Sequence, residues 1–319
     1  MQISQISGFA WPEFGLDRAL WLEDGQSLLI GGKQQPCQID AATGEVLQTL
    51  EAHPQQSPLR ALALSPDQRL LAGGSHDGWG ILIWNLASGR IQTRLPTHAL
   101  TMGLSFDPDG QSLMAASGHE SGFASGVHRW DLATGRRVGE FRSQIEDFGF
   151  YHRVCFSQDG SRFATAGGSC GQYYAQIWDR ATDSCLQELP LATEVKYMRF
   201  APGSNDSLQV ATDDADVLLG YVLLSTWTDL SGQPSETRVE FKGHGRSTIN
   251  CVALNPDATL IASGAGSEDS DAARIWNPFT CQQVAMVPGK GALDIHFSPQ
   301  GERLAVLDRQ SVRIFELRA

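Results

Sequence analysis

Several features that would place this chain in a common class are missing from its sequence. Its six cysteines form no CxxC pair and no short metal-ligand spacing, which argues against a structural zinc site or a thiol redox motif. No apolar run is long enough to span a membrane, and the first residues lack the basic and apolar segments of a secretory signal. We therefore expect a cytoplasmic protein with no membrane association.

Lysine is also scarce, occurring only at positions 33, 196, 242 and 290. Acidic residues outnumber Lys and Arg by 36 to 24, and the formal net charge is -12. A field of this sign repels phosphate backbones, so nucleic acid is an unlikely partner. The hydrophobic content of 41% is that of a globular chain able to bury a sizeable core.

What the sequence does contain is a regular spacing of tryptophan. Trp84, Trp130, Trp178, Trp227 and Trp276 are separated by 46, 48, 49 and 49 residues. A period of this length indicates a repeat architecture. Turn residues follow at a fixed offset, as in the Ala-Ser-Gly sequence at 87–89 and the Ala-Thr-Gly sequence at 133–135.

A second turn signature lies about half a period before each Trp, for example Ser-Pro-Asp at 65–67 and Asp-Pro-Asp-Gly at 107–110. Proline suits the first corner of such a turn, and Asp or Gly suits the second. The runs between turns, such as 61–64 and 260–262, are apolar at nearly every position, which is typical of strands buried on both faces. The repeat therefore predicts small four-stranded antiparallel sheets stacked on one another, which are the blades of a β-propeller.

Counting the first turn of each repeat predicts a single all-β domain, a seven-bladed β-propeller over residues 1–319. The expected blades are 18–53, 57–98, 100–142, 147–190, 193–242, 245–288 and 291–317. The last repeat supplies only three strands. Residues 1–9 precede the first blade and should provide the fourth strand, closing the ring and covering an open sheet edge.

The dipeptide motifs identify a family. Gly243-His244 before a blade, and Trp130-Asp131 within one, resemble the signatures of WD-repeat β-propellers, and the match extends over nearly the whole chain. The family contains structural hydrogen-bond chains made of a His, a Ser or Thr on the second strand, an Asp in the next turn and the Trp. The resemblance implies this structural role in the sixth blade for His244, Ser263, Asp269 or Asp271, and Trp276.

Other blades depart from the family pattern. Ile39 and Phe315 stand in the Trp position of the first and seventh blades, and Thr228 stands where Asp is usual in the fifth. The remaining repeat tryptophans are expected to fill the gaps between blades rather than to stack on nucleic-acid bases.

One motif suggests an enzyme. Gly167, Ser169 and Gly171 match GxSxG, with His76 and Asp77 on another blade as candidate partners. A nucleophile elbow requires a strand-to-helix turn, whereas a hairpin is expected here. We favour a Gly-rich turn, and a propeller hydrolase or lactonase-like enzyme that uses the channel mouth or the Ser169 loop is the alternative.

Two acidic runs, at 213–216 and 268–271, could gather around a hard cation. Neither has the spacing of an EF-hand, and each blade uses a turn Asp in any case, so solvated loop carboxylates are favoured. The prediction contains no metal and no cofactor.

The loops that vary between repeats are where a function is expected, because turns that are alike only close hairpins. In this family the connections between second and third strands share one face, called the top. They are long in blades two to six, over residues 76–79, 118–126, 170–174, 213–219 and 266–272. The opposite face has mostly compact turns, with a longer loop at 233–236.

A second pattern marks the top face. The position two residues before the first buried apolar residue of each innermost strand should line the channel mouth, and it is occupied by Arg18, Arg60, Met102, His152, Lys196, Asn250 and Leu293. Three or four of these are cationic, which fits a purposeful basic ring and an ordinary wet channel mouth about equally well. Nearby loops would add interface anchors, namely Trp79, His119, Phe123, Tyr173 and Tyr174.

These patterns predict a non-catalytic scaffold or adaptor that binds one or more proteins through the top face. The partner should present an acidic or aromatic-bearing segment. Nucleic-acid contact by the basic residues is a weaker alternative, which would show a steep salt dependence.

Overall fold

The structure is a computed structural model of the chain. It describes residues 1–10, 18–31, 35–55, 57–75, 79–97, 99–118, 125–142, 149–169, 171–213, 221–245, 247–266, 272–289 and 291–318. These residues form two compact units, one made of Met1–Thr49, Ala211–Ser225 and Arg238–Ala319 and the other of Leu50–Val210 and Thr226–Thr237. No helix among the described residues is long and apolar enough to cross a membrane.

The first unit contains three four-stranded antiparallel sheets. Blade one is β2 (Arg18–Trp21), β3 (Ser27–Gly31), β4 (Cys37–Asp40) and β5 (Val46–Thr49). Blade six is β22 (Ile249–Leu254), β23 (Ile261–Ala265), β24 (Ala273–Trp276) and β25 (Gln283–Val287). Blade seven is β26 (Asp294–Phe297), β27 (Arg303–Leu307), β28 (Ser311–Arg318) and β1 (Gln2–Ala10), in the order β1-β28-β27-β26.

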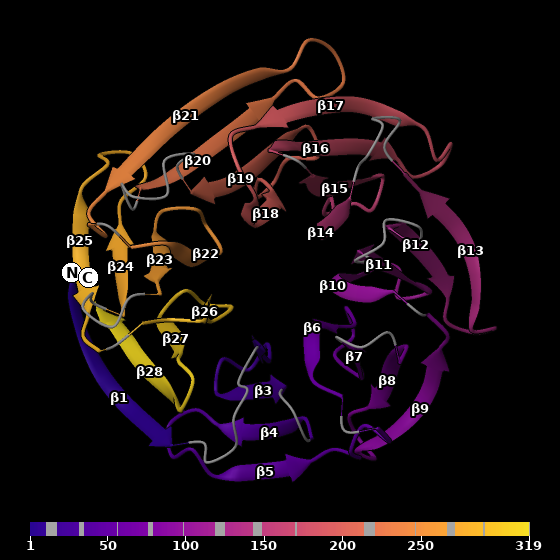
Figure 1. The fold of residues 1–319 in the computed structure, drawn as a ribbon. Coiled ribbons are helices and arrows are strands. Elements are labelled where there is room, and N and C mark those ends of the chain that lie inside the picture. The colour runs from indigo at the N-terminus through magenta and orange to yellow at the C-terminus, as the bar shows by residue number, and fades with distance from the viewer. Residues whose placement is uncertain are drawn as a thin grey trace. The chain divides into compact units, whose positions relative to one another are not determined.

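The second unit contains blades two to four. Blade two is β6 (Leu59–Leu64), β7 (Leu70–Ser75), β8 (Ile81–Asn85) and β9 (Arg90–Leu95), which follow one another across one sheet in Figure 1. Blade three is β10 (Leu100–Phe106), β11 (Ser112–Gly118), β12 (Gly126–Asp131) and β13 (Arg136–Phe141). Blade four is β14 (Phe150–Phe156), β15 (Arg162–Ser169), β16 (Gln172–Asp179) and β17 (Cys185–Leu191). A single pairing, Gly118 with Phe150, joins blades three and four into one eight-stranded sheet.

A further sheet, blade five, has the order β18-β19-β20-β21, with bounds Val195–Phe200, Ser207–Asp213, Tyr221–Thr228 and Ser235–Lys242. The strands of the described residues thus fall into seven consecutive sets of four, and the predicted all-β propeller fold is confirmed. In each blade the second and third strands connect at one end, here called the top end. The turns after the first and third strands lie at the other, bottom end.

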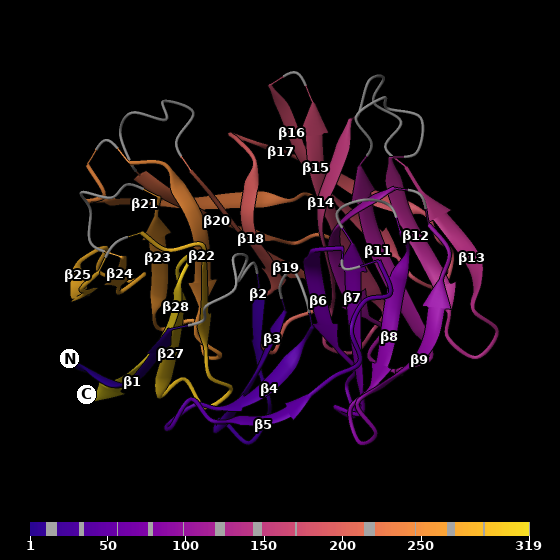
Figure 2. The same cartoon turned by 60° about the horizontal axis from the view of Figure 1, so that its bottom comes forward.

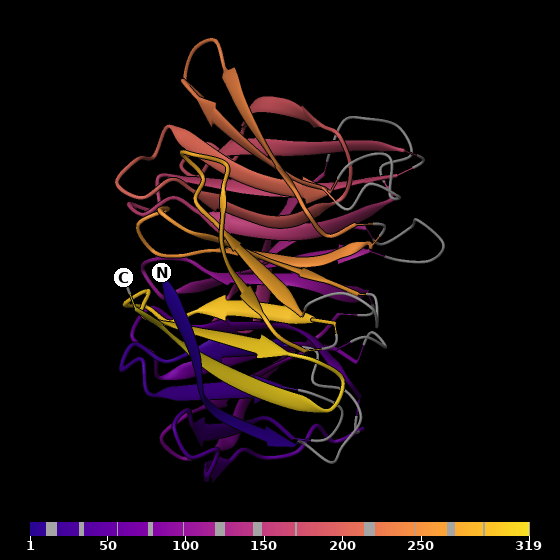
Figure 3. The same ribbon diagram turned by 90° about the vertical axis from the view of Figure 1, so that its left-hand side faces the viewer.

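The amino-terminal strand completes blade seven, as predicted. β1 pairs antiparallel with β28 from Gln2 opposite Arg318 to Ala10 opposite Ser311; the two strands are neighbours in Figure 1, and Figure 3 shows the two termini close together. Phe9 packs on the core shared by blades seven and one, and Ile3 packs on the core shared by blades six and seven. The strand therefore contributes both backbone pairing and apolar contacts.

The core lies between neighbouring sheets, which explains why the strands are apolar on both faces. Blades two and three stand side by side in Figure 2, and Ala72 and Ile83 of one meet Leu113 and Trp130 of the other. In blades three and seven, the middle strands lie between a neighbouring sheet on either side, so their alternating side chains both enter apolar surroundings.

The hydrogen-bond chain of blade six is buried within the core. The Ser263 hydroxyl lies 2.7 Å from Nε2 of His244 and accepts a hydrogen bond of 2.8 Å from Nε1 of Trp276. Burial, with Arg274 nearby, lowers the pKa of His244 to about 4, so the imidazole is neutral at neutral pH. Asp269 and Asp271 lie outside the described residues.

In other blades the indole N–H of the tryptophan donates to a different acceptor. In blade four, Thr165 stands in the register of Ser263 and accepts from Nε1 of Trp178 at 3.0 Å. In blade two, Trp84 donates instead to the carbonyl of Glu51 at 2.8 Å. Ile39 and Phe315, which replace Trp in blades one and seven, are almost fully buried at the corresponding register positions. The inter-blade gap is thus filled even where the polar chain is lost.

In blade three the indole N–H of Trp130 lacks a hydrogen-bond acceptor, and the strand register shows where an acceptor could be introduced. Nε1 of Trp130 is buried and has no hydrogen-bond partner among the described residues, and Ala115 occupies the position of Ser263. We expect Ala115→Ser to supply the acceptor and to raise the free energy of unfolding by about 1 kcal/mol. Denaturant unfolding measures the change.

The control for this variant is Ala116→Ser, because Ala116 is also buried but lies on the opposite face of the strand. It should bury a hydroxyl away from the indole and give no gain. If Ala115→Ser were no more stable than the wild type, a missing acceptor at Trp130 would not be a weakness of blade three.

Candidate protein-interaction surface

The first strand of several blades contains an irregularity at one repeated position near its top end. Register shifts skip Arg60 in β6, Met102 in β10, His152 in β14 and Asn250 in β22. A β-bulge leaves one residue unpaired and redirects its side chain. The residues that the sequence placed at the channel mouth therefore include four that share a common backbone feature.

The top end of blade two combines a bulged cation with an exposed aromatic ring. Leu59, beside Arg60, pairs with Ser75, and the Ser75 hydroxyl accepts the backbone N–H of Trp79 at 3.0 Å. The Trp79 side chain is 45% exposed, and the Arg60 side chain is exposed as well. The backbone anchored at Ser75 therefore presents a large ring to solvent at the top end of blade two, the same end as Arg60.

The top ends of blades four and five carry a cluster around one carboxylate. Glu194 Oε1 lies 3.3 Å from Nδ1 of His152, and its Oε2 lies 3.3 Å from Nζ of Lys196. A guanidinium nitrogen of Arg153 donates to the carbonyl of Lys196 at 3.1 Å. The sequence pattern identified two of these cations but missed Glu194, which pairs with both.

Burial and charge set the protonation of this cluster. Burial lowers the pKa of His152, and Arg153 and Lys196 act in the same direction against Glu194. Burial alone would raise the pKa of Glu194, but Lys196 and His152 together lower it. His152 is thus largely neutral at neutral pH and Glu194 is ionised, so His152 does not add to a basic ring.

Arg18 belongs to a tie between blades one and seven. The buried Asp294 carboxylate lies 3.6 Å from Arg18 Nη1, accepts the N–H of Ala19 at 3.3 Å and lies 2.7 Å from Nε2 of His296. Trp21 Nε1 donates to the carbonyl of His296 at 3.0 Å. Burial would raise the pKa of Asp294, but the charges of His296 and Arg18 lower it. Arg18 therefore neutralises a buried carboxylate within the fold.

Asn250 and Leu293 line a cavity of about 670 Å³ at the top ends of blades six and seven. The side-chain amide of Asn250 donates to the carbonyl of Ala292 at 3.0 Å. The turn of blade seven at 308–311 closes one side. Its Asp308 carboxylate accepts the N–H groups of Gln310 and Ser311, both at 2.8 Å, so the wall is held by local hydrogen bonds.

The expectation that residues 170–174 form a long connection is wrong. Ser169 pairs directly with Gln172, so the link is a two-residue hairpin turn with Gly171 at a φ of 81°, a conformation that glycine tolerates. Tyr173 and Tyr174 lie on β16, and a Cβ on Gly168 would be 2.7 Å from Cδ1 of Tyr173. Both tyrosines are half-buried, and the ring of Tyr173 packs against its own blade.

His119 and Phe123 lie outside the described residues, as do most of the other top-end loops at 76–78, 214–220 and 267–271. The GxSxG segment is a strand, a two-residue turn and a strand, which is not the strand-to-helix geometry of a nucleophile elbow. Within the described residues no group of three His, Cys, Asp or Glu side chains is placed to hold a metal ion.

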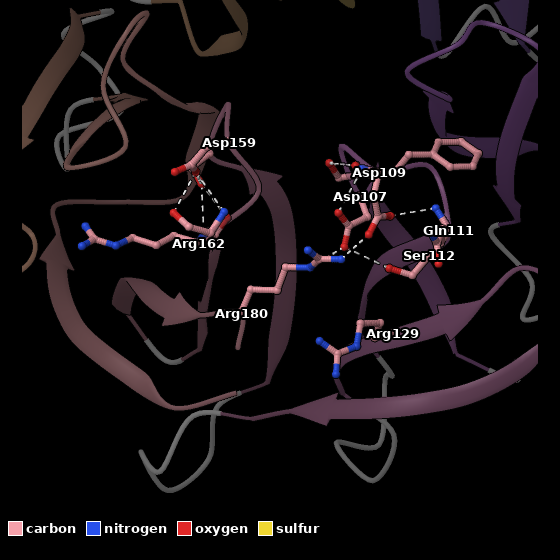
Figure 4. Close-up of polar contacts among 12 residues, drawn as sticks. Asp107, Asp109, Gln111, Ser112, Arg129, Asp159, Arg162 and Arg180 are labelled. Atoms are coloured by element: carbon pink, nitrogen blue, oxygen red, sulfur yellow. Dashed lines mark hydrogen bonds and ion pairs between the residues drawn. The ribbon is translucent and has the colours of Figure 1, made fainter. Parts of the chain in front are cut away.

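The bottom ends of the blades in the second unit use arginine differently. Figure 4 shows Arg180 of blade four reaching Asp107 and Asp109 of blade three, with Nε 2.7 Å from the Asp107 carboxylate. Arg129 donates two hydrogen bonds, of 2.9 and 2.7 Å, to Asp183 of the next blade. Burial raises the pKa of Asp107, although Arg180 opposes that shift. These bottom-end arginines tie blades together.

Comparisons with known proteins agree with this architecture. The model of the WD domain, G-beta repeat, matches residues 44–80 and 235–277. The β-propeller domain of Cps50 (Swd1) from Myceliophteria thermophila superposes with a TM-score of 0.79 at 17% identity, covering 98% of this chain and 100% of that domain. That likeness shows a shared fold.

Two curated relatives are similar over longer segments. Cell division cycle 20.1, cofactor of APC complex, from Arabidopsis thaliana is 24% identical over 286 residues, which are 87% of this chain and 57% of the relative. A periodic tryptophan protein 2 homolog from Schizosaccharomyces pombe is 30% identical over 183 residues, which are 52% of this chain and 19% of the relative. The matches thus span little more than half of the first relative and about a fifth of the second.

Proposed function

We propose that this chain, a WD-repeat β-propeller, is a non-catalytic scaffold or adaptor that binds a partner protein at the top ends of its blades. The proposal rests mainly on Trp79, a residue that is 45% exposed although its backbone is anchored at Ser75. Aromatic side chains of this kind are the usual hot spots of protein interfaces. The Arabidopsis relative is itself named as a cofactor of a complex.

The charges at the top ends of blades two, four and five support an acidic or aromatic-bearing partner segment. Arg60 is exposed in blade two, and Lys196 and Arg153 outnumber Glu194 at blades four and five. A carboxylate on the partner would gain from these cations, and rim charges of this type chiefly speed association. Arg180, by contrast, pairs with carboxylates of the neighbouring blade at the bottom end, and Arg18 at the top end is already paired with Asp294.

The enzymatic alternative finds less support in the geometry. Ser169 ends β15 in a hairpin, and the described residues contain no cluster of metal ligands. Nucleic-acid contact is opposed by the net charge of -12 and by the carboxylates that pair with Arg18, His152 and Lys196. Protein binding therefore accounts best for the exposed residues.

The proposal is tested by affinity capture with tagged variants from an extract of the source organism. Arg60→Glu and Trp79→Ala should recover less of the partner, with the loss at Trp79 amounting to about 30-fold in affinity. The free energy of unfolding of each variant should lie within about 0.5 kcal/mol of the wild-type value, as is usual for substitutions at exposed sites.

The matched control is Gln233→Ala, an exposed residue at the bottom end of blade five. It should recover the partner as well as the wild type does. Full recovery by both top-end variants, or loss of the partner by the control, would show that the binding surface lies elsewhere.

A further inference from the structure

The bottom end of blade six carries an aromatic side chain that the repeat does not require. Phe279 is 77% exposed. It stands three residues after Trp276, and the same position in blades one to four is an exposed alanine, at Ala42, Ala87, Ala133 and Ala181. The turn therefore has no structural need for a large apolar residue here.

The backbone of this turn is as fixed as that of its small counterparts. Asn277 Oδ1 accepts the N–H groups of Phe279 and Thr280 at 2.9 and 3.0 Å, just as Asp40 Oδ1 accepts those of Ala42 and Thr43 at 2.9 and 2.8 Å. Presenting the ring on an ordered turn lowers the entropic cost of using it in an interface.

A groove of about 460 Å³ adjoins this turn, and Asn277 is part of its wall. It lies between the first turns of blades six and seven, at 255–260 and 300–302, and is also lined by Met1, Leu317 and Arg318. In blade seven, β28 and β1 are the third and fourth strands, and no turn joins them among the described residues. The groove occupies the corner where the other blades have such a turn.

The carboxylates of Asp257 and Glu302, together with Glu316 beside Arg318, outnumber the two cations at the groove, Arg318 and the Met1 ammonium, by one. Arg318 is neutralised by Glu316, with its Nη2 2.7 Å from the carboxylate. The Asp257 carboxylate accepts from the hydroxyl and the N–H of Thr259 at 2.7 and 3.1 Å, and these bonds lower its pKa and keep it ionised. Glu302 is exposed, and no ion pair to it is present in the described part of the chain.

We propose that Phe279 and this groove form a docking site for an extended segment of a partner protein that carries a Lys or Arg beside a large apolar side chain. The apolar side chain packs on the Phe279 ring, and the cation enters the groove toward Asp257 and Glu302. Opposite charge selects the segment, and the aromatic ring supplies the buried contact. This site shares no residue with the top-end surface.

The test uses random peptides displayed on phage and selected on the immobilised full-length protein, followed by fluorescence anisotropy with the most enriched peptide that carries Lys or Arg, labelled with a fluorophore. Selected peptides should combine Lys or Arg with an aromatic or large aliphatic residue. Phe279→Ala and Glu302→Lys should each weaken binding of that peptide by about tenfold or more. Phe279→Ala should fold normally, because alanine occupies this position in four other blades.

The control is Trp79→Ala, which should bind the peptide as tightly as the wild type and so separates this site from the proposed top-end function. The proposal is overturned if no peptide that carries Lys or Arg is enriched, or if the enriched basic peptides bind Phe279→Ala unchanged. It is also overturned if the wild type sediments as a dimer that Phe279→Ala converts to a monomer, since the occupant would then be a second copy of the chain.

Discussion

Deleting residues 1–9 should abolish cooperative folding of the chain or cause it to aggregate. The deletion removes the pairing of β1 with β28 from Gln2 to Phe9, and it strips Ile3 and Phe9 from the cores on either side of blade seven. It also exposes β28 as an unpaired edge, which is a template for intermolecular pairing. Thermal unfolding and size-exclusion chromatography of the truncated protein measure the effect.

A synthetic peptide of residues 1–10 provides the control for this deletion. Added in trans, it should restore the lost strand by mass action and return a cooperative thermal transition near that of the wild type. A truncated protein that stays monomeric and melts with the wild type would mean that β1 is dispensable for closing blade seven.

Ser263→Ala should destabilise the protein by about 2–6 kcal/mol. The hydroxyl is the shared partner of His244 and Trp276, and all three side chains are almost completely buried. Its removal leaves two buried polar groups unpaired, each costing about 1–3 kcal/mol. Urea unfolding of the variant gives the change directly.

Ser263→Thr is the matched control, because it keeps the hydroxyl, and Thr165 already serves in this register in blade four. It should lose much less stability than Ser263→Ala. Equal losses in the two variants would indicate that packing, and not the hydrogen-bond chain, holds blade six together.

Much of the fold could be predicted from the sequence because it depends on local signals that repeat. The spacing of Trp84, Trp130 and Trp178 reports the blade period, and turn residues mark the ends of the strands. Even the closing strand followed from counting, since three strands in the last repeat left one to be supplied by residues 1–9. These inferences needed no knowledge of contacts between blades.

The side-chain pairing of the candidate surface could not be predicted in the same way. Arg18 pairs with Asp294, which belongs to another blade and lies near the other end of the sequence. No residue near Arg18 in the sequence indicates that partner. Glu194 was overlooked because the pattern considered only one position per blade, although it stands two residues before Lys196.

Two further features show the limits and the reach of sequence comparison. The hairpin at Gly171 looked like a loop because the segment is rich in glycine, but its tight turn extends both strands and places Tyr173 and Tyr174 on one of them. Phe279, by contrast, could have been found by aligning the repeats with one another, since its position holds alanine in four blades.

The most direct test of the top-end binding surface is the pair of rate constants for association and dissociation of the captured partner. If Arg60 steers an acidic segment and Trp79 anchors it, Arg60→Glu should slow association, and Trp79→Ala should speed dissociation by about 30-fold, with Gln233→Ala unchanged in both rates. Wild-type rate constants in both top-end variants, or altered ones in Gln233→Ala, would contradict the account.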